Sequence, residues 1–276
     1  ATATFESNPR QTSDQVEDLG VIEEAGGGGK DGKSAPPMPE ESRTKFRGNV
    51  SARADFTTNA KLSGDHSSGD LLFFPGLELG LNTDLGRGFA FDIAGKVESA
   101  LYTKFDERAF IGYSVPATLE WRPRPNLPRI YVGTEAYRFD SFDTGDLVTQ
   151  ALGVGVGTDY GISFNGGSSL AFIGYNFTHY FSDPSADNRG VHRAVIGLAH
   201  QFKPQLTGQV FYAYQFSDFE DVDRHDSRHI VAATLIYQFN RHLFGNVAGS
   251  FIDNDSTQNR ASYQAAVASV GVTWQF

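Results

Sequence analysis

The chain has 276 residues, 39% of them hydrophobic, a formal net charge of −10 and a mean hydropathy of −0.33. It has no cysteine and no run of about 18 apolar residues, so disulfide bonds, thiolate chemistry and transmembrane helices are not expected. The acidic balance argues against nucleic acid as a partner, and 30 Gly, 23 Phe and 11 Tyr beside one Met favour an all-β protein.

Residues 1–44 differ in composition from the rest of the chain. They contain a run of glycines at 26–29, a proline cluster at 36–39 and many acidic residues, with few large apolar side chains. Such a segment buries too little apolar surface to offset the entropy lost on ordering. We therefore predict a disordered or plug-like N-terminal tail on the periplasmic side or in the pore, followed by a single β-barrel domain over residues 45–276.

Apolar and polar residues alternate with a period of two along most of the remaining chain, which is typical of strands. The segments exceed the ordinary strand length of about 5–6 residues and suit tilted strands that cross a bilayer. The pattern predicts 12 strands, at 45–58, 71–83, 88–103, 108–122, 129–141, 147–160, 167–181, 190–202, 205–219, 226–240, 243–254 and 261–276.

The connectors between these strands alternate in character. Tight or proline-containing turns, such as Lys203-Pro204-Gln205, take turns with longer acidic loops, such as 218–226. Outer-membrane barrels have short periplasmic turns and longer external loops. With an even strand number, both ends of the barrel domain fall on the short-turn side, so strand count and connector type agree.

The alternation also assigns the two faces of each strand. Charges on a lipid-facing surface cost about 2–4 kcal/mol near the bilayer midplane, so charged strand residues are expected to face inward. The expected charged wall is confined to the first five strands, and the later strands present Gly, Ala, Ser, Thr and Gln inward, such as Gly153, Thr207 and Thr234. The candidate lumen-lining or selectivity residues are Arg47, Arg53, Asp55, Glu78, Asp92, Lys96, Glu98, Glu120, Arg122 and Glu135.

Aromatic residues gather near strand ends, as in the interfacial girdles of membrane barrels. We predict membrane-interface roles near the short turns for Trp121, Tyr237, Phe239, Trp274 and Phe276. The last strand, 261–276, is amphipathic and ends on Phe276. It resembles the closing strand of bacterial outer-membrane β-barrels, which implies recognition by the barrel-assembly machinery.

The strand–turn–strand phrase at 200–210, HQFKPQLTGQV, is likewise similar to repeats of bacterial outer-membrane β-barrel proteins, and the resemblance spans residues 45–276. It looks most like β-barrel porins, including types found in exopolysaccharide gene clusters. The resemblance implies a single antiparallel up-and-down transmembrane β-barrel in the outer membrane of a Gram-negative envelope, in contact with lipid and lipopolysaccharide. Autotransporter translocators have similar length, but the Gly/Pro-rich tail departs from the helix that fills their pore.

Two functions remain open from the sequence. The leading one is a channel for passive passage of small polar solutes or saccharides. The alternative is a non-conducting barrel that anchors or scaffolds a periplasmic or membrane protein partner through residues 1–44.

No catalytic group, metal site or cofactor is expected. Ser227 and His229 are two residues apart on one face, as in outer-membrane phospholipase, but no Asn partner is evident. The acidic run at 218–226 lacks the central Gly of a calcium loop.

Overall fold

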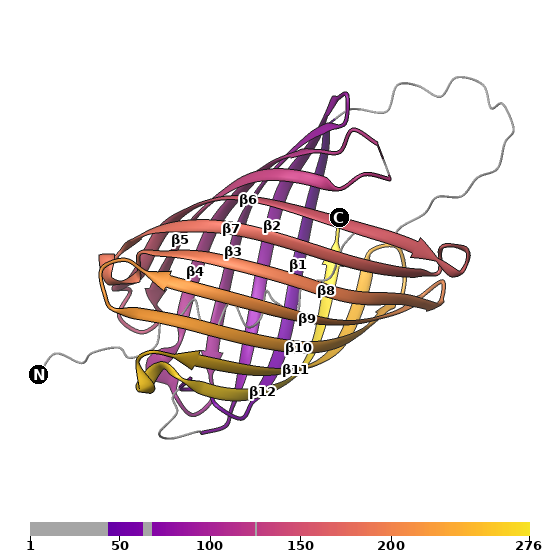
Figure 1. The fold of residues 1–276 in the computed structure, drawn as a ribbon. Coiled ribbons are helices and arrows are strands. Elements are labelled where there is room, and N and C mark those ends of the chain that lie inside the picture. The colour runs from indigo at the N-terminus through magenta and orange to yellow at the C-terminus, as the bar shows by residue number, and fades with distance from the viewer. Residues whose placement is uncertain (1–43, 63–67, 125) are drawn as a thin grey trace, which may run out of the picture.

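The structure is a computed structural model that describes residues 44–62, 68–124 and 126–276. Within these residues the chain forms 12 antiparallel strands that close into one barrel (Figure 1), which confirms the predicted fold class. The strands are β1 (Thr44–Thr57), β2 (Asp70–Gly86), β3 (Phe89–Tyr102), β4 (Phe110–Trp121), β5 (Arg129–Ser141), β6 (Leu147–Phe164), β7 (Ser169–Asp183), β8 (Arg189–Lys203), β9 (Leu206–Phe219), β10 (Arg224–Gln238), β11 (Leu243–Ser256) and β12 (Tyr263–Gln275). The predicted tail, residues 1–44, lies outside the described residues except for Thr44, the first residue of β1.

The barrel closes through pairing of the first strand with the last. The β1–β12 register runs from Asn49 opposite Gln275 to Thr57 opposite Val267. It is extended by two backbone hydrogen bonds between Gly48 and Phe276, of 3.0 and 2.9 Å. Each strand therefore has a partner on both sides, so the described sheet leaves no open edge to the hydrocarbon.

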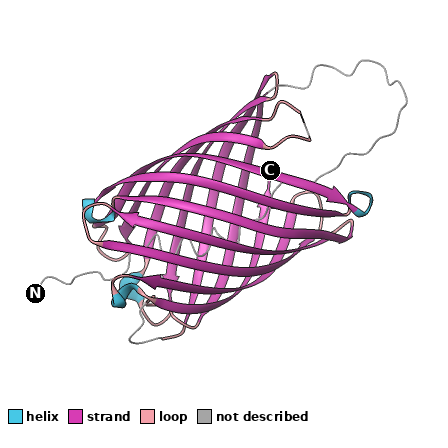
Figure 2. Cartoon of the chain, in the orientation of Figure 1, coloured by secondary structure: helices cyan, strands magenta, loops and turns pink. Residues whose placement is uncertain are grey.

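The two ends of the barrel differ, as the connectors predicted. The start of β1 and the end of β12 lie at the end that holds the β2–β3, β4–β5, β6–β7, β8–β9 and β10–β11 connections, here called the short-turn end. The other end, the loop end, carries the helical turns η1 (Asp106–Arg108), η3 (Ser185–Asp187) and η4 (Asn259–Ala261), whereas η2 (Asn165–Gly167) lies in a short turn (Figure 2). No helix in the described part of the chain is long and apolar enough to cross a bilayer.

The outer wall exposes apolar side chains from every strand, as a lipid-facing band requires. The predicted interface aromatics lie on this wall near the short-turn end, in ring pairs: Phe89 with Trp121, Tyr237 with Phe239, and Trp274 with Phe276, at centroid distances of 6.0, 5.0 and 5.3 Å. This placement is the one expected of an interfacial girdle, and the membrane-interface role of these residues stays a prediction.

Aromatic rings lie across glycines of neighbouring strands. On the inner wall, a Cβ added to Gly112 would lie 2.5 Å from the Phe139 ring, and one added to Gly157 would lie 2.3 Å from Tyr131. Gly153 and Tyr180, at 2.5 Å, form a third such pair. The missing side chains let these rings pack directly against the backbone of the neighbouring strand.

We predict that Gly112→Ala lowers the free energy of unfolding by about 1–3 kcal/mol, the usual cost of overpacking, because the buried Phe139 ring must leave the wall. Gly95→Ala is the control, since its added Cβ meets no atom within 4 Å. Urea unfolding of the folded barrel in detergent measures both. Equal stability of the two variants would contradict this account of the packing.

Candidate functional site

The first charge cluster lies inside the barrel near the short-turn end. The Arg47 guanidinium of β1 binds both carboxylate oxygens of Asp92 on β3, and its Nε donates to Glu78 of β2 at 3.2 Å. The Lys96 ammonium lies 3.7 Å from Glu78, and the Asn82 amide donates to Asp92 at 3.4 Å. Two cations thus balance two carboxylates.

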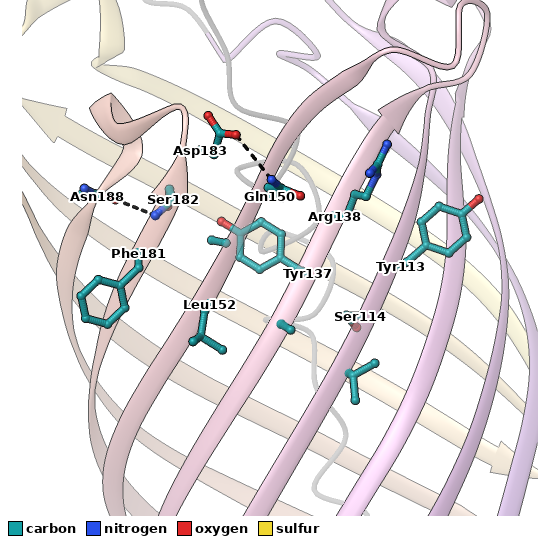
Figure 3. Close-up of a pocket in the computed structure, with 13 residues that line it drawn as sticks. Tyr113, Ser114, Tyr137, Arg138, Gln150, Leu152, Phe181, Ser182, Asp183 and Asn188 are labelled. Carbon is teal, nitrogen blue, oxygen red and sulfur yellow. Dashed lines mark hydrogen bonds between the residues drawn. The ribbon is translucent and has the colours of Figure 1, made fainter.

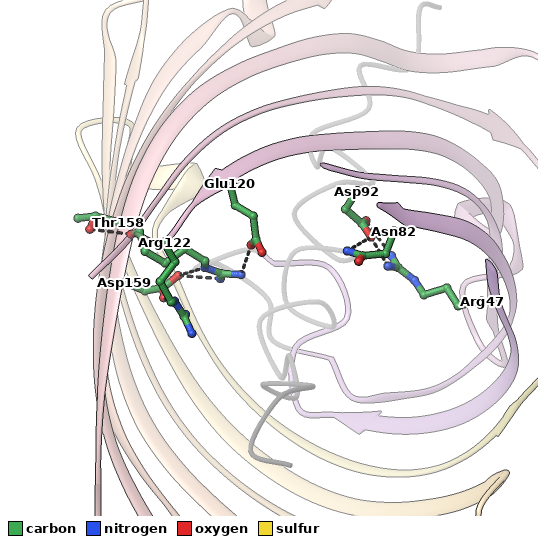
Figure 4. A network of polar contacts seen from close by, with 8 residues as sticks. Arg47, Asn82, Asp92, Glu120, Arg122, Thr158 and Asp159 are labelled. Carbon is green, nitrogen blue, oxygen red and sulfur yellow. Dashed lines mark hydrogen bonds and ion pairs between the residues drawn. The ribbon is translucent and has the colours of Figure 1, made fainter. Parts of the chain in front are cut away.

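A second charge cluster projects inward from β4–β6 on another side of the lumen (Figure 4). Arg129 donates to Glu120 at 2.8 Å and to Asp159 at 2.9 and 2.7 Å. Arg122 lies 3.7 Å from the Asp159 carboxylate. The side chains of Arg129, Glu120 and Asp159 remain 38, 30 and 31% exposed, so these ions keep contact with solvent-accessible space inside the barrel.

Arg53 and Asp55 of β1 pair with each other at 3.0 Å further toward the loop end, where the Arg53 guanidinium lies 4.5 Å from the Phe74 ring centroid. Glu98 and Glu135 lie on the inward-facing sides of β3 and β5. The predicted lumen residues are therefore distributed along the wall rather than gathered at one level.

The expectation that charge is confined to the first five strands is wrong. Asp159 of β6 joins the second charge cluster, and Arg189, Asp226 and Arg228 are buried on β8 and β10. Asp159 has the same parity as Gly153 and the other glycines already assigned to the lumen. The period-two alternation of β6 therefore already indicates an inward-facing Asp159.

Arginines also line the interior at the loop end, against aromatic rings. The Arg189 guanidinium lies 5.3 Å from the Tyr180 centroid and 5.5 Å from that of Phe219, and Arg224 lies 4.4 Å from Phe219. Burial raises the pKa of Asp187 in the adjacent loop, and the nearby guanidiniums of Arg189 and Arg224 act in the opposite direction.

The later strands are also less polar inside than expected. An apolar cluster of β7 and β9–β12 contains Phe172, Phe211, Ile230, Ile252 and Tyr263. A second apolar cluster lies on the earlier strands and is centred on Leu72, Phe74, Phe110, Tyr137 and Phe139. Small inward residues leave room for these larger ones, a size complementarity that alternation alone does not reveal.

The segment after β1 folds across the barrel mouth and contacts both apolar clusters. Leu62 is 4% exposed and packs in the first cluster, whereas Ala60 belongs to the second. The Asn59 amide donates to the Gln264 carbonyl at 3.1 Å, and the Thr58 N–H donates to Ala266 at 2.9 Å. We call residues 58–62 the mouth segment.

Ser227 and His229 do not form a nucleophile–base contact. The Ser227 hydroxyl lies 3.3 Å from the Tyr214 hydroxyl, and His229 Nδ1 shares a 2.7 Å hydrogen bond with the Tyr212 hydroxyl. Among the described residues, no group of three or more His, Cys, Asp or Glu side chains is arranged to hold a metal ion. The absence of enzymatic activity stays a prediction.

Comparison with known proteins connects this geometry to a class of membrane protein. The family model "Putative beta-barrel porin 2" matches residues 189–276, which cover β8–β12. A search of curated proteins finds no match.

Solved structures are similar to this chain at low sequence identity. The translocator domain of the autotransporter NalP from Neisseria meningitidis is 10% identical, with a TM-score of 0.56 and 100% of both chains covered. An anion-selective porin from Comamonas acidovorans is 10% identical, with a TM-score of 0.45, and the match covers 86% of this chain and 100% of the porin. The KdgM porin is 12% identical, with a TM-score of 0.48, and the match covers 83% of this chain and 99% of the porin. The first likeness supports the fold alone. The protein is an outer-membrane β-barrel of the bacterial envelope, and the porin family match covers its C-terminal strands.

We predict that Arg129→Gln lowers the free energy of unfolding by about 1–3 kcal/mol, because it removes charge-assisted hydrogen bonds to two carboxylates and leaves them facing each other. Arg122→Gln is the matched control, with an expected cost below about 1 kcal/mol for its longer, more exposed ion pair. Urea unfolding of the two variants at low and high salt tests this difference. Indistinguishable variants would show that the second charge cluster does not brace the wall.

Proposed function

We propose that the barrel is a narrow channel for the passive passage of small polar solutes or saccharides. The observation that carries this proposal is the partial exposure of the side chains in the two charge clusters, because ions packed in a dry core would be almost wholly buried. A barrel of 12 strands lies between eight-stranded barrels filled by side chains and 16–18-stranded porins with open water channels.

Selectivity is proposed to come from Arg47, Glu78, Asp92, Lys96, Glu120 and Arg122, with Arg53, Asp55, Glu98 and Glu135 along the route and with Arg129 and Asp159 added by the structure. In the second charge cluster, the charges of Arg122 and Arg129 cancel those of Glu120 and Asp159. Such a wall gives weak discrimination between cations and anions and suits neutral, hydrogen-bonding solutes.

The second candidate is a non-conducting barrel that anchors or scaffolds a partner protein through residues 1–44. The apolar clusters at the mouth segment favour its first element, the closed lumen. Contact of the last strand with the assembly machinery fits either function and remains a prediction. The two functions differ in whether the mouth segment obstructs a wet lumen.

The channel proposal is tested by swelling of proteoliposomes in uncharged saccharides of increasing size. We expect size-dependent swelling, and an at least twofold faster rate for Leu62→Ala, because this change removes the side chain that anchors the mouth segment. Leu127→Ala, at an exposed position in the β4–β5 turn, is the control and leaves the rate unchanged. No swelling with any of the folded proteins would favour the scaffold.

Charge neutralisation tests the proposed selectivity residues. Glu120→Gln leaves the second charge cluster with excess positive charge, so the anion-to-cation permeability ratio is expected to rise at least twofold. The reversal potential under a salt gradient measures this ratio. Asp218→Asn, at a 56% exposed side chain on the outward face of β9, is the control. Equal shifts for both variants would rule out a specific role for the cluster.

A further inference from the structure

A groove is present on the outer wall of β4–β7 near the loop end, separate from the lumen (Figure 3). Its volume is about 630 Å³, within the range of roughly 300–1,000 Å³ common for ligand sites. The groove arises from strand register. Val115, Ala136, Leu152 and Phe181 form a row across four strands, and the small Ala136 lies between larger neighbours.

The next outward-facing row toward the loop end is polar. Tyr113, Arg138, Gln150 and Asp183 lie opposite one another across the same four strands. The two rows are two residues apart on each strand, or about 7 Å. The groove therefore changes from apolar to hydrogen-bonding over the length expected at the boundary between acyl chains and head groups.

The polar row keeps unused hydrogen-bonding capacity. Arg138 is 50% exposed and donates to Asp140 through Nε, at 2.8 and 3.0 Å, which leaves the N–H groups of its two terminal nitrogens available to a ligand. Gln150 donates to Asp183 at 3.4 Å and retains its carbonyl oxygen as an acceptor. Asp140 offsets the charge of Arg138 and Asp183 adds a negative charge, so the row disfavours a bare phosphate and suits hydroxyl and amide groups.

We propose that this groove binds one outer-leaflet lipid with an acylated amino-sugar head, such as lipid A. One acyl chain lies along the row of Val115, Ala136, Leu152 and Phe181, and the sugar hydroxyl and amide groups bond to Arg138, Gln150 and Asp183. Surrounding lipid is as apolar as the groove, so retention comes from close packing and the head-group hydrogen bonds rather than from the hydrophobic effect. This inference does not depend on conduction.

Native mass spectrometry of the full chain, released from detergent with added lipid, tests the proposal. The dissociation constants of diphosphoryl and monophosphoryl lipid A are expected to agree within threefold. Phosphatidylglycerol is expected to bind with at least tenfold lower affinity. Ala136→Phe fills the groove and is expected to weaken lipid A binding at least tenfold. Ala268→Phe, at an exposed alanine on the outward face of β12, is the matched control and retains binding.

Arg138→Ala provides a second test that leaves the groove open, and at least a fivefold loss is expected. Heat-modifiable migration on gels verifies that each variant is a folded barrel. Unchanged binding by folded Ala136→Phe or by Arg138→Ala would overturn the site. Binding that falls tenfold on loss of one phosphate, or equal binding of phosphatidylglycerol, would overturn the amino-sugar assignment.

Discussion

Closure of the sheet between β1 and β12 is the constraint on which the remaining structure depends. A backbone N–H or C=O group left unpaired in hydrocarbon costs several kcal/mol, so a spanning sheet must have no free edge. The paired register between Asn49 and Thr57 of β1 and their partners on β12 meets this condition. Once the sheet is closed, every second side chain must face lipid and the others must share the interior.

The interior accommodates its side chains by three different means. The Tyr131 ring packs over Gly157, charged groups pair along the wall near the short-turn end, and apolar residues, including Phe139 over Gly112, gather at the mouth. The first two keep side chains close to the wall and fit a passage. The third narrows the passage at one level, which makes the mouth segment the structural element that decides between a channel and a closed barrel.

Much of the fold could be predicted from alternation because closure imposes that pattern on the sequence. The segment predicted at 129–141 has the bounds of β5, and the one predicted at 167–181 corresponds to β7, which is displaced by two residues. Packing across the lumen was not predictable, because it depends on strand curvature and stagger. The cluster that holds Leu62, Ile230 and Ile252 joins residues that are far apart in the chain and has no local signature.

Other features were visible in the sequence but were not recognised. Asp159 and Arg228 share the parity of small residues already assigned to the lumen, and Arg129 begins a predicted strand. Their roles emerge only when neighbouring strands are paired: Arg129 lies opposite Asp159 in the β5–β6 register and reaches Glu120 on the other side. The outer groove likewise depends on the register of four strands, so no single segment indicates it.

The central claim, that the interior is a wet passage, is tested most directly by single-channel conductance in planar bilayers. The full chain is predicted to give discrete, steady conductance steps with weak ion selectivity. Silent bilayers containing barrels shown by heat-modifiable migration to be folded would contradict the claim, and would indicate that the packing around the mouth segment closes the lumen.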